Sequence, residues 1–178
     1  MIIINVLKYW YRDDRASVAI EVGLLIPVML TLLLGVVDVG NYICADQKLI
    51  DANHMVADLL TRNPTIATSD LQDAFTAGQL TMGPYDAATF GIDVVGVQFE
   101  GGPTQPQIQW RYTNNAVTNG DVPTDTNNLG NDQDGVIVVT ATYTYVPFLI
   151  GGLANLSYNL KEVAIARGRN GLYIPWNQ

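Results

Sequence analysis

The chain has few of the residues that perform thiol, acid–base or metal chemistry. Its 178 residues include one cysteine, Cys44, and one histidine, His54. These counts exclude an internal disulfide and a zinc site built from cysteine and histidine. We expect Cys44 to be a small apolar helix residue and His54 to lie at the surface. The sequence also lacks a nucleophile elbow and a phosphate-cradling glycine loop, so we expect no enzyme activity, no cofactor and no metal site.

Four carboxylates in the polar segment 113–134 form the one grouping that resembles a metal site: Asp121, Asp125, Asp132 and Asp134. Calcium takes oxygen ligands of this kind. A calcium-loop register that starts at Asp125 fails, because Leu129 occupies a ligand position and Val136 falls where a bidentate glutamate belongs. The composition favours a long, solvated loop, with calcium binding as the alternative.

Another acid, Glu21, stands alone in an apolar run. Residues 17–37 contain 15 Ala, Val, Ile, Leu or Met residues, and Glu21 is the one charged residue among them. A helix of this length covers about 31 Å, close to the hydrocarbon thickness of a bilayer, so the run predicts a transmembrane helix. A carboxylate there is costly unless a positive group pairs with it. The alternative is that Glu21 faces lipid headgroups.

A removable signal peptide is the main competing interpretation of the run. Its apolar region would be shorter and would end in small residues at a cleavage site, whereas Asp38 follows here. Three cations precede the run, Lys8, Arg12 and Arg15, while Lys48 is the one cation in the 24 residues after it. The positive-inside rule therefore predicts that residues 1–16 lie in the cytoplasm and the rest outside.

The start of the run carries a family resemblance. Arg15-Ala16-Ser17-Val18-Ala19-Ile20-Glu21 is followed by Leu25-Ile26-Pro27. This pattern resembles the TadE-like pseudopilins of the tight adherence (Tad, or Flp) pilus system, with their basic leader, Ser-Val-Ala-x-Glu motif and Leu-x-Pro step. The resemblance implies that a prepilin peptidase cuts between Ala16 and Ser17, although glycine is commoner than alanine before the cut. It also assigns Glu21 an assembly role, as partner of the new amine at Ser17.

The resemblance further implies a minor pilin of a type IVb pilus that acts in surface adhesion and biofilm formation. Its partners would be other pilin or pseudopilin subunits, prepilin peptidase and the inner-membrane assembly platform. The chain would cross the bacterial inner membrane once, with its head in the periplasm, outside the cell or in the pilus. The alternative is a membrane-anchored extracytoplasmic binding module. A net charge of −8 makes nucleic acid an unsuitable partner.

The helical pattern continues beyond the apolar run. Six residues at spacings of three and four form a packing stripe: Tyr42, Ala45, Leu49, Ala52, Val56 and Leu59. Polar residues lie mostly off it: Asp46, Lys48, Asp51, Asn53 and Asp58. One helix from about Ser17 to Thr61 is predicted, with a kink or loosened turn at Pro27 and an end at Asn63-Pro64. The stripe would pack on the chain's own head or on a partner helix.

The remaining pattern predicts a small α+β head. A second helix over 69–81 has Ser69 and Gln72 at capping-box spacing, with Leu71, Phe75 and Leu80 available to pack. Antiparallel strands follow over 92–99, with an irregularity at Gly96, and over 108–112, 136–145 and 161–167, where Ile108, Trp110 and Tyr112 alternate with polar residues. The predicted organisation is a leader (1–16), a transmembrane helix (17–37) and a pilin-like head (38–178).

Overall fold

The computed structural model describes residues 14–102, 105–148, 156–169 and 171–177, with only the backbone for residues 14–17 and 19. Its helices are α2 (Asp14–Leu60), α3 (Thr68–Thr81), the 3-10 turn η1 (Ala87–Thr89) and α4 (Val122–Asp125). Its strands are β1 (Ile66–Ala67), β2 (Gly91–Phe99), β3 (Pro106–Asn114), β4 (Gly135–Tyr145), β5 (Tyr158–Ala166) and β6 (Trp176–Asn177). The predicted α+β class is confirmed.

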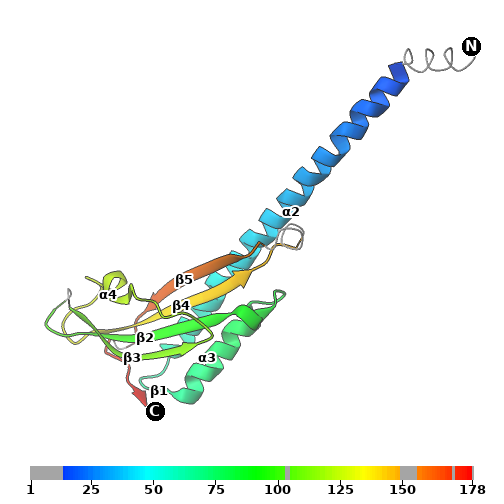
Figure 1. The fold of residues 1–178 in the computed structure, drawn as a ribbon. Helices are drawn as coiled ribbons and strands as arrows, with labels where there is room; N and C mark the ends of the chain where they lie inside the picture. The colour runs from blue at the N-terminus through cyan, green and yellow to red at the C-terminus, as the bar shows by residue number, and fades with distance from the viewer. Residues whose placement is uncertain (1–13, 103–104, 149–155, 170, 178) are drawn as a thin grey trace, which may run out of the picture.

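The long helix α2 has two parts with different surroundings. Its 47 residues correspond to about 70 Å of helix. The N-terminal part extends away from the head, and the C-terminal part lies along the sheet (Figure 1). The single helix predicted across residues 17–61 is confirmed, and it ends at Leu60, three residues before Asn63-Pro64.

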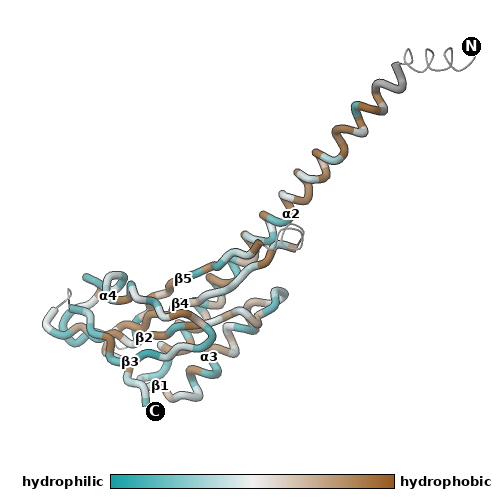
Figure 2. Tube along the Cα trace, in the orientation of Figure 1, coloured by the Kyte–Doolittle hydropathy of each residue, from teal (hydrophilic) through white to brown (hydrophobic). Residues whose placement is uncertain are grey.

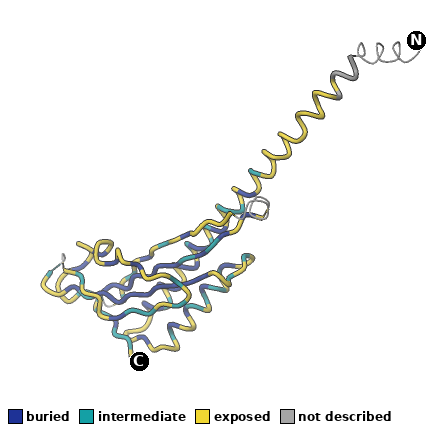
Figure 3. The backbone as a smooth tube through the Cα atoms, viewed as in Figure 1, coloured by how far each residue is buried: buried dark blue, intermediate teal, exposed yellow. Residues whose placement is uncertain are grey.

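The sheet that receives α2 has the strand order β3-β2-β4-β5, with every neighbouring pair antiparallel. Helix α2 packs against β4 and β5, and α3 packs beside α2. The main core lies between these helices and the sheet, and side chains such as Leu49, Leu71, Ile92 and Val139 are fully buried there. Figure 3 shows the buried backbone concentrated in this region.

The N-terminus of α3 is capped differently from the prediction. The helix begins at Thr68, and Asp70 Oδ2 accepts a hydrogen bond from the Ala67 backbone N–H over 2.8 Å. The predicted capping box of Ser69 and Gln72 is therefore wrong. Asp70, the third residue of the helix, instead satisfies the free N–H group of the N-cap residue Ala67.

The face that α3 buries also differs in part. Leu71 is buried as predicted, but Leu80 is 79% exposed, so its predicted packing is wrong. Gly78 replaces it in the contact, where an added Cβ would lie 2.8 Å from the Phe90 ring. At this end of the core, the backbone of α3 at Gly78 approaches the Phe90 ring closely, so no large side chain of α3 fits between them. Phe75 stacks on Phe90 at a centroid distance of 5.8 Å.

The irregularity predicted at Gly96 is confirmed as a register shift between β2 and β3. Gly96 pairs with Trp110 and Val97 pairs with Ile108, so the extra residue is Gln109 in β3. A bulge of this kind moves the side chains beyond it to the other face. Ile108 is therefore 43% exposed while Trp110 is only 9% exposed, and the alternation expected through Ile108 is broken.

The segment 113–134 is only in part the long, solvated loop that its composition predicts. Its first two residues belong to β3, and Val122, Asn119 and Thr126 are buried. Val122 joins five side chains on the second face of the sheet: Val95, Val97, Phe99, Val136 and Val138. Because β2 and β4 are apolar on both faces here, the sheet needs a second cover, which α4 and its flanking loops provide.

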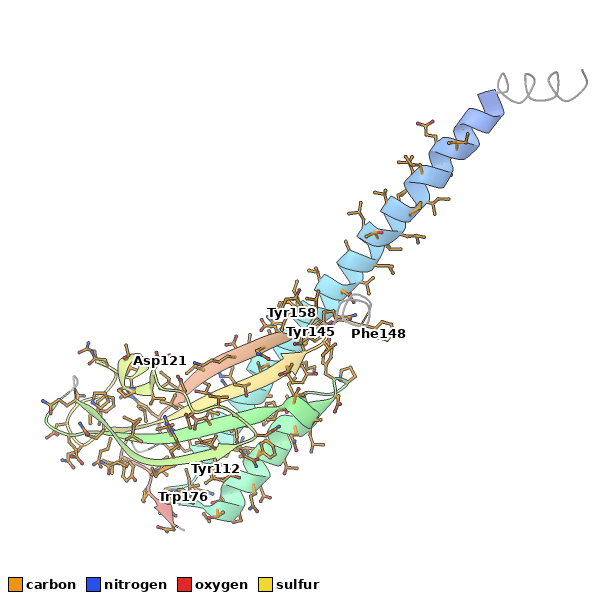
Figure 4. All side chains as sticks on the ribbon, viewed as in Figure 1. Tyr112, Asp121, Tyr145, Phe148, Tyr158 and Trp176 are labelled. Carbon is orange, nitrogen blue, oxygen red and sulfur yellow. The ribbon has the colours of Figure 1, made fainter. Side chains whose placement is uncertain are left out.

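The C-terminal segment returns to the end of the head farthest from the N-terminal part of α2 (Figure 1), which the sequence does not predict. Strand β6 pairs in parallel with β1. The Trp110 indole N–H donates a hydrogen bond to the Ile174 carbonyl over 2.9 Å. Trp176 lies beside Tyr112, at a centroid distance of 6.1 Å (Figure 4).

Candidate membrane and assembly site

The N-terminal part of α2 is an uncovered apolar rod. Every side chain from Ile20 to Leu34 is exposed, and Leu24 is 75% exposed. Figure 2 shows that this stretch is mostly hydrophobic. Within the described residues, α2 is the one helix long and apolar enough to cross a membrane. It is therefore a candidate membrane span.

The predicted assembly residues lie along this rod. Ala16 and Ser17 have helical backbone, whereas residues 1–13 of the predicted leader lie outside the described part of the chain. Glu21 is exposed, and no ion pair joins it to a described side chain. The helix runs unbroken through Pro27, and Thr31 Oγ1 donates to the Pro27 carbonyl over 2.8 Å. A processed amine at Ser17 would lie one helical turn from Glu21.

The packing stripe contacts the chain's own head, as the first of the two predicted alternatives requires. Four members are fully buried, Ala45, Leu49, Ala52 and Val56, and the remaining two, Tyr42 and Leu59, pack against the same core. Asn53, one of the polar residues expected mostly off the stripe, is also buried, at 2% exposed. The buried face is wider than the stripe because α2 contacts the sheet and α3 at once.

The two single-copy residues both lie on the outside of α2. His54 is exposed, which confirms its predicted surface position. Cys44 is also exposed, so it contributes little to the core. Neither residue belongs to a group of three or more possible metal ligands among the described residues.

Tyrosines surround the point where α2 leaves the head. The Tyr42 ring lies edge-on to Tyr145 at 5.8 Å and to Tyr158 at 5.7 Å between centroids. The Tyr85 hydroxyl donates to the Asn41 carbonyl over 3.1 Å. Burial, then the negative charge of Asp38, raises the pKa of Tyr145 above its ordinary value of 10.0. The Tyr145 phenol is therefore neutral at neutral pH.

A groove of about 610 Å³ opens at the same junction. Ten residues of α2 and of the β4 and β5 ends line it: Thr31, Leu32, Gly35, Val36, Asp38, Val39, Tyr42, Tyr145, Pro147 and Tyr158. Asp38 is 5% exposed and is its one charged residue. The groove therefore joins the candidate membrane span to the head.

The sequence does not predict this junction, because its residues come from three separate segments. One signal was available, since no charged residue occurs from Gly135 to Leu160. A stretch that long without charge is unusual for a hairpin that faces water on both sides.

The acids of segment 113–134 have structural roles or face solvent. Asp132 Oδ1 accepts from the Gly101 N–H over 2.8 Å, and Asp134 Oδ2 accepts from the Asn131 N–H over 2.9 Å. Arg167 lies 3.7 Å from Asp134, while Asp121 and Asp125 are exposed. Two of the four candidate calcium ligands, Asp132 and Asp134, thus already accept backbone hydrogen bonds that stabilise the loops.

These features place the protein in the class with an α+β head on one long helix, the exposed part of which is a candidate membrane span. Within that class, the family model described as TadE-like protein matches residues 16–58. The match covers the exposed rod and most of the packing stripe, and it confirms the resemblance predicted from Arg15–Glu21 and Pro27. It is consistent with a TadE-like protein of the Tad pilus system. Searches of curated proteins and of solved structures found no match.

Proposed function

We propose that this chain is a TadE-like pseudopilin that takes part in assembling a Tad/Flp-type pilus for surface adhesion and biofilm formation. The role is structural rather than catalytic. The chain crosses the bacterial inner membrane once through α2, with residues 1–16 in the cytoplasm and the head in the periplasm or outside the cell. Other pilin subunits, prepilin peptidase and the assembly platform are its partners.

The observation that carries this proposal is the coincidence of the TadE-like match with the two-part helix. Residues 16–58 include an exposed apolar rod followed by a stripe buried in the head. An exposed apolar surface of this extent marks a membrane or protein contact. One continuous helix can therefore anchor the subunit in the membrane and later pack against neighbouring subunits in a filament.

The charge pattern supports a processed N-terminus. Glu21 has no described partner and lies four residues beyond Ser17. Peptidase cleavage before Ser17 creates an ammonium group that can neutralise Glu21, in the same chain or in a neighbour. Removal of residues 1–16 also takes away the cations that hold the N-terminus in the cytoplasm.

N-terminal sequencing of the chain extracted from membranes of its native host tests the proposal. Ser17 should be the first residue of the mature chain. Ala16→Asp should block the cut, because a small residue precedes it in the resembling family, whereas the matched variant Ala16→Gly should be processed. An intact Met1 in the wild-type chain would contradict the pseudopilin pathway and leave a plain membrane anchor.

A further inference from the structure

The end of the head nearest the membrane span carries exposed apolar side chains. On the β4–β5 side these are Val146 (57% exposed), Phe148 (82%), Leu156 (41%) and Tyr158 (47%). On α2 they continue with Val39 (58%) and Ile43 (52%). Figure 4 shows Phe148 at the end of β4, beside α2 and pointing away from the sheet. A largely exposed phenylalanine next to other exposed apolar side chains indicates a contact surface.

The surface lies at the depth expected for the edge of the bilayer. A span over residues 17–37 covers about 31 Å, so the hydrocarbon boundary falls near Asp38. The groove places Val36, Asp38 and Val39 against Pro147 and Tyr158. Pro147, just after β4, and Tyr158, the first residue of β5, are therefore level with the boundary and continuous with the span.

The chemistry of the surface suits lipid better than water. No charged residue occurs from Gly135 to Leu160. Asp86 lines a hollow with Val146 and Phe148, and its carboxylate already accepts a hydrogen bond from the Ala88 N–H. Tyr42, Tyr145 and Tyr158 form an aromatic cluster at the level where tyrosine is enriched in membrane proteins.

We propose that this end of the head is a second membrane contact, in which Val146, Phe148, Leu156 and Tyr158 enter the interfacial layer of the bilayer that α2 crosses. The inference rests on the membrane insertion of α2 proposed above. The contact fixes the tilt of the head on the membrane. It is released when the subunit leaves the bilayer, which makes the same apolar surface available to other subunits.

Fluorescent reporters on the full chain test the contact. Because Cys44 is the one cysteine, a Cys44→Ser background accepts a single new cysteine at Leu30 in the span, Ser157 beside the apolar surface or Thr124 on α4. Each labelled chain is reconstituted in phosphatidylethanolamine–phosphatidylglycerol vesicles that contain doxyl-labelled lipid. Lipid quenching should be strong at Leu30, clear at Ser157 and negligible at Thr124.

The outcomes separate this inference from the insertion on which it rests. Quenching at Leu30 without quenching at Ser157 would overturn the contact and leave insertion intact, while no quenching at Leu30 would overturn both. A Ser157 signal that depends on protein density but not on doxyl lipid would assign the surface to a second copy of the chain and overturn the lipid contact.

Two variants identify the side chains responsible. Phe148→Ser combined with Val146→Ser should remove most of the Ser157 quenching and leave the Leu30 quenching unchanged. The matched control Leu172→Ser alters an apolar side chain that is 60% exposed outside this surface, so it should change neither signal. Unchanged Ser157 quenching in the double variant would contradict the assignment of the contact to these residues.

Discussion

The backbone N–H of Asn119 donates a hydrogen bond to Asp93 Oδ2 over 2.7 Å, and neither residue is more than 2% exposed. Thr113 Oγ1 donates to Asp93 Oδ1 over 2.9 Å, and Arg111 Nε lies 3.5 Å from the same oxygen. Lys161 Nζ donates to Asn119 Oδ1 over 3.2 Å. These contacts join the segment after β3 to the second face of the sheet, opposite α2 and α3.

Asp93→Ala should therefore destabilise the head strongly. The substitution leaves the Asn119 N–H and the Thr113 hydroxyl without their acceptor and Arg111 without its ion-pair partner, which costs about 3 to 5 kcal/mol. The control Asp121→Ala removes an exposed carboxylate and should change stability by no more than about 0.5 kcal/mol. Chemical unfolding monitored by tryptophan fluorescence measures both. Similar small losses for the two variants would show that the cluster contributes little.

Leu49→Ala tests whether the packing stripe stabilises the chain's own head. Leu49 is fully buried, so its truncation should cost about 2 to 5 kcal/mol, measured in detergent by the unfolding of the head. Met55→Ala, at a 43% exposed position of the same helix, should cost much less. Equal stability of the two variants would indicate that the packing stripe contacts a partner helix rather than the chain's own head.

Gly96→Ala should disturb the bulged pair of β2 and β3. An added Cβ would collide with the Trp110 indole, which donates to the Ile174 carbonyl. Overpacking of this kind costs about 1 to 3 kcal/mol, visible as a lower melting temperature. Gly120→Ala is the matched control, because nothing lies within 4 Å of its added Cβ. A melting temperature unchanged by Gly96→Ala would mean that Trp110 moves without cost.

Glu162→Gln should raise stability at neutral pH. Burial, then the negative charge of Asp46, raises the pKa of Glu162 above its ordinary 4.5, while His54 lowers it. The folded state thus binds more protons than the unfolded state between pH 4.5 and the folded pKa, so stability falls as the pH rises through that window. The gain from Glu162→Gln should appear above the window and vanish below pH 4.5.

Melting temperatures of both chains across this pH range measure the effect. In an Asp46→Asn background the gain from Glu162→Gln should be smaller, because the neighbouring negative charge is gone. A gain that is the same at every pH would point to packing rather than to ionisation.

Glu21→Val tests the assembly charge. The variant should insert at least as well as the wild type, since it removes a costly carboxylate from the span. It should be lost from pili, because the Ser17 ammonium then lacks its partner, at a cost of about 3 to 5 kcal/mol. That cost corresponds to more than about a hundredfold in an association constant. Glu21→Asp keeps the charge and serves as the control.

Membrane fractionation and immunoblotting of sheared pili measure insertion and assembly separately. Normal incorporation of the Glu21→Val chain into pili would contradict the charge-pairing mechanism.

Local patterns predicted the long helix, the second helix, the four main strands and the TadE-like start. Three such patterns define the long helix: a continuous apolar run, a stripe at spacings of three and four, and Asn63-Pro64 at the end. Each involves residues that are close in the chain, so the sequence alone predicts it. The period-two strands and the irregularity at Gly96 were predictable for the same reason.

Tertiary structure decided what these elements cover. The extra residue at Gln109 lies in the partner strand of Gly96, so the exposure of Ile108 depends on a pairing that neither strand specifies alone. The burial of Asn53 follows from two elements that contact α2 together. Likewise, Tyr42 contacts Tyr145 and Tyr158 only because the last residue of β4 and the first residue of β5 lie beside α2. Burial and contact are properties of several segments brought together, whereas periodicity is a property of one.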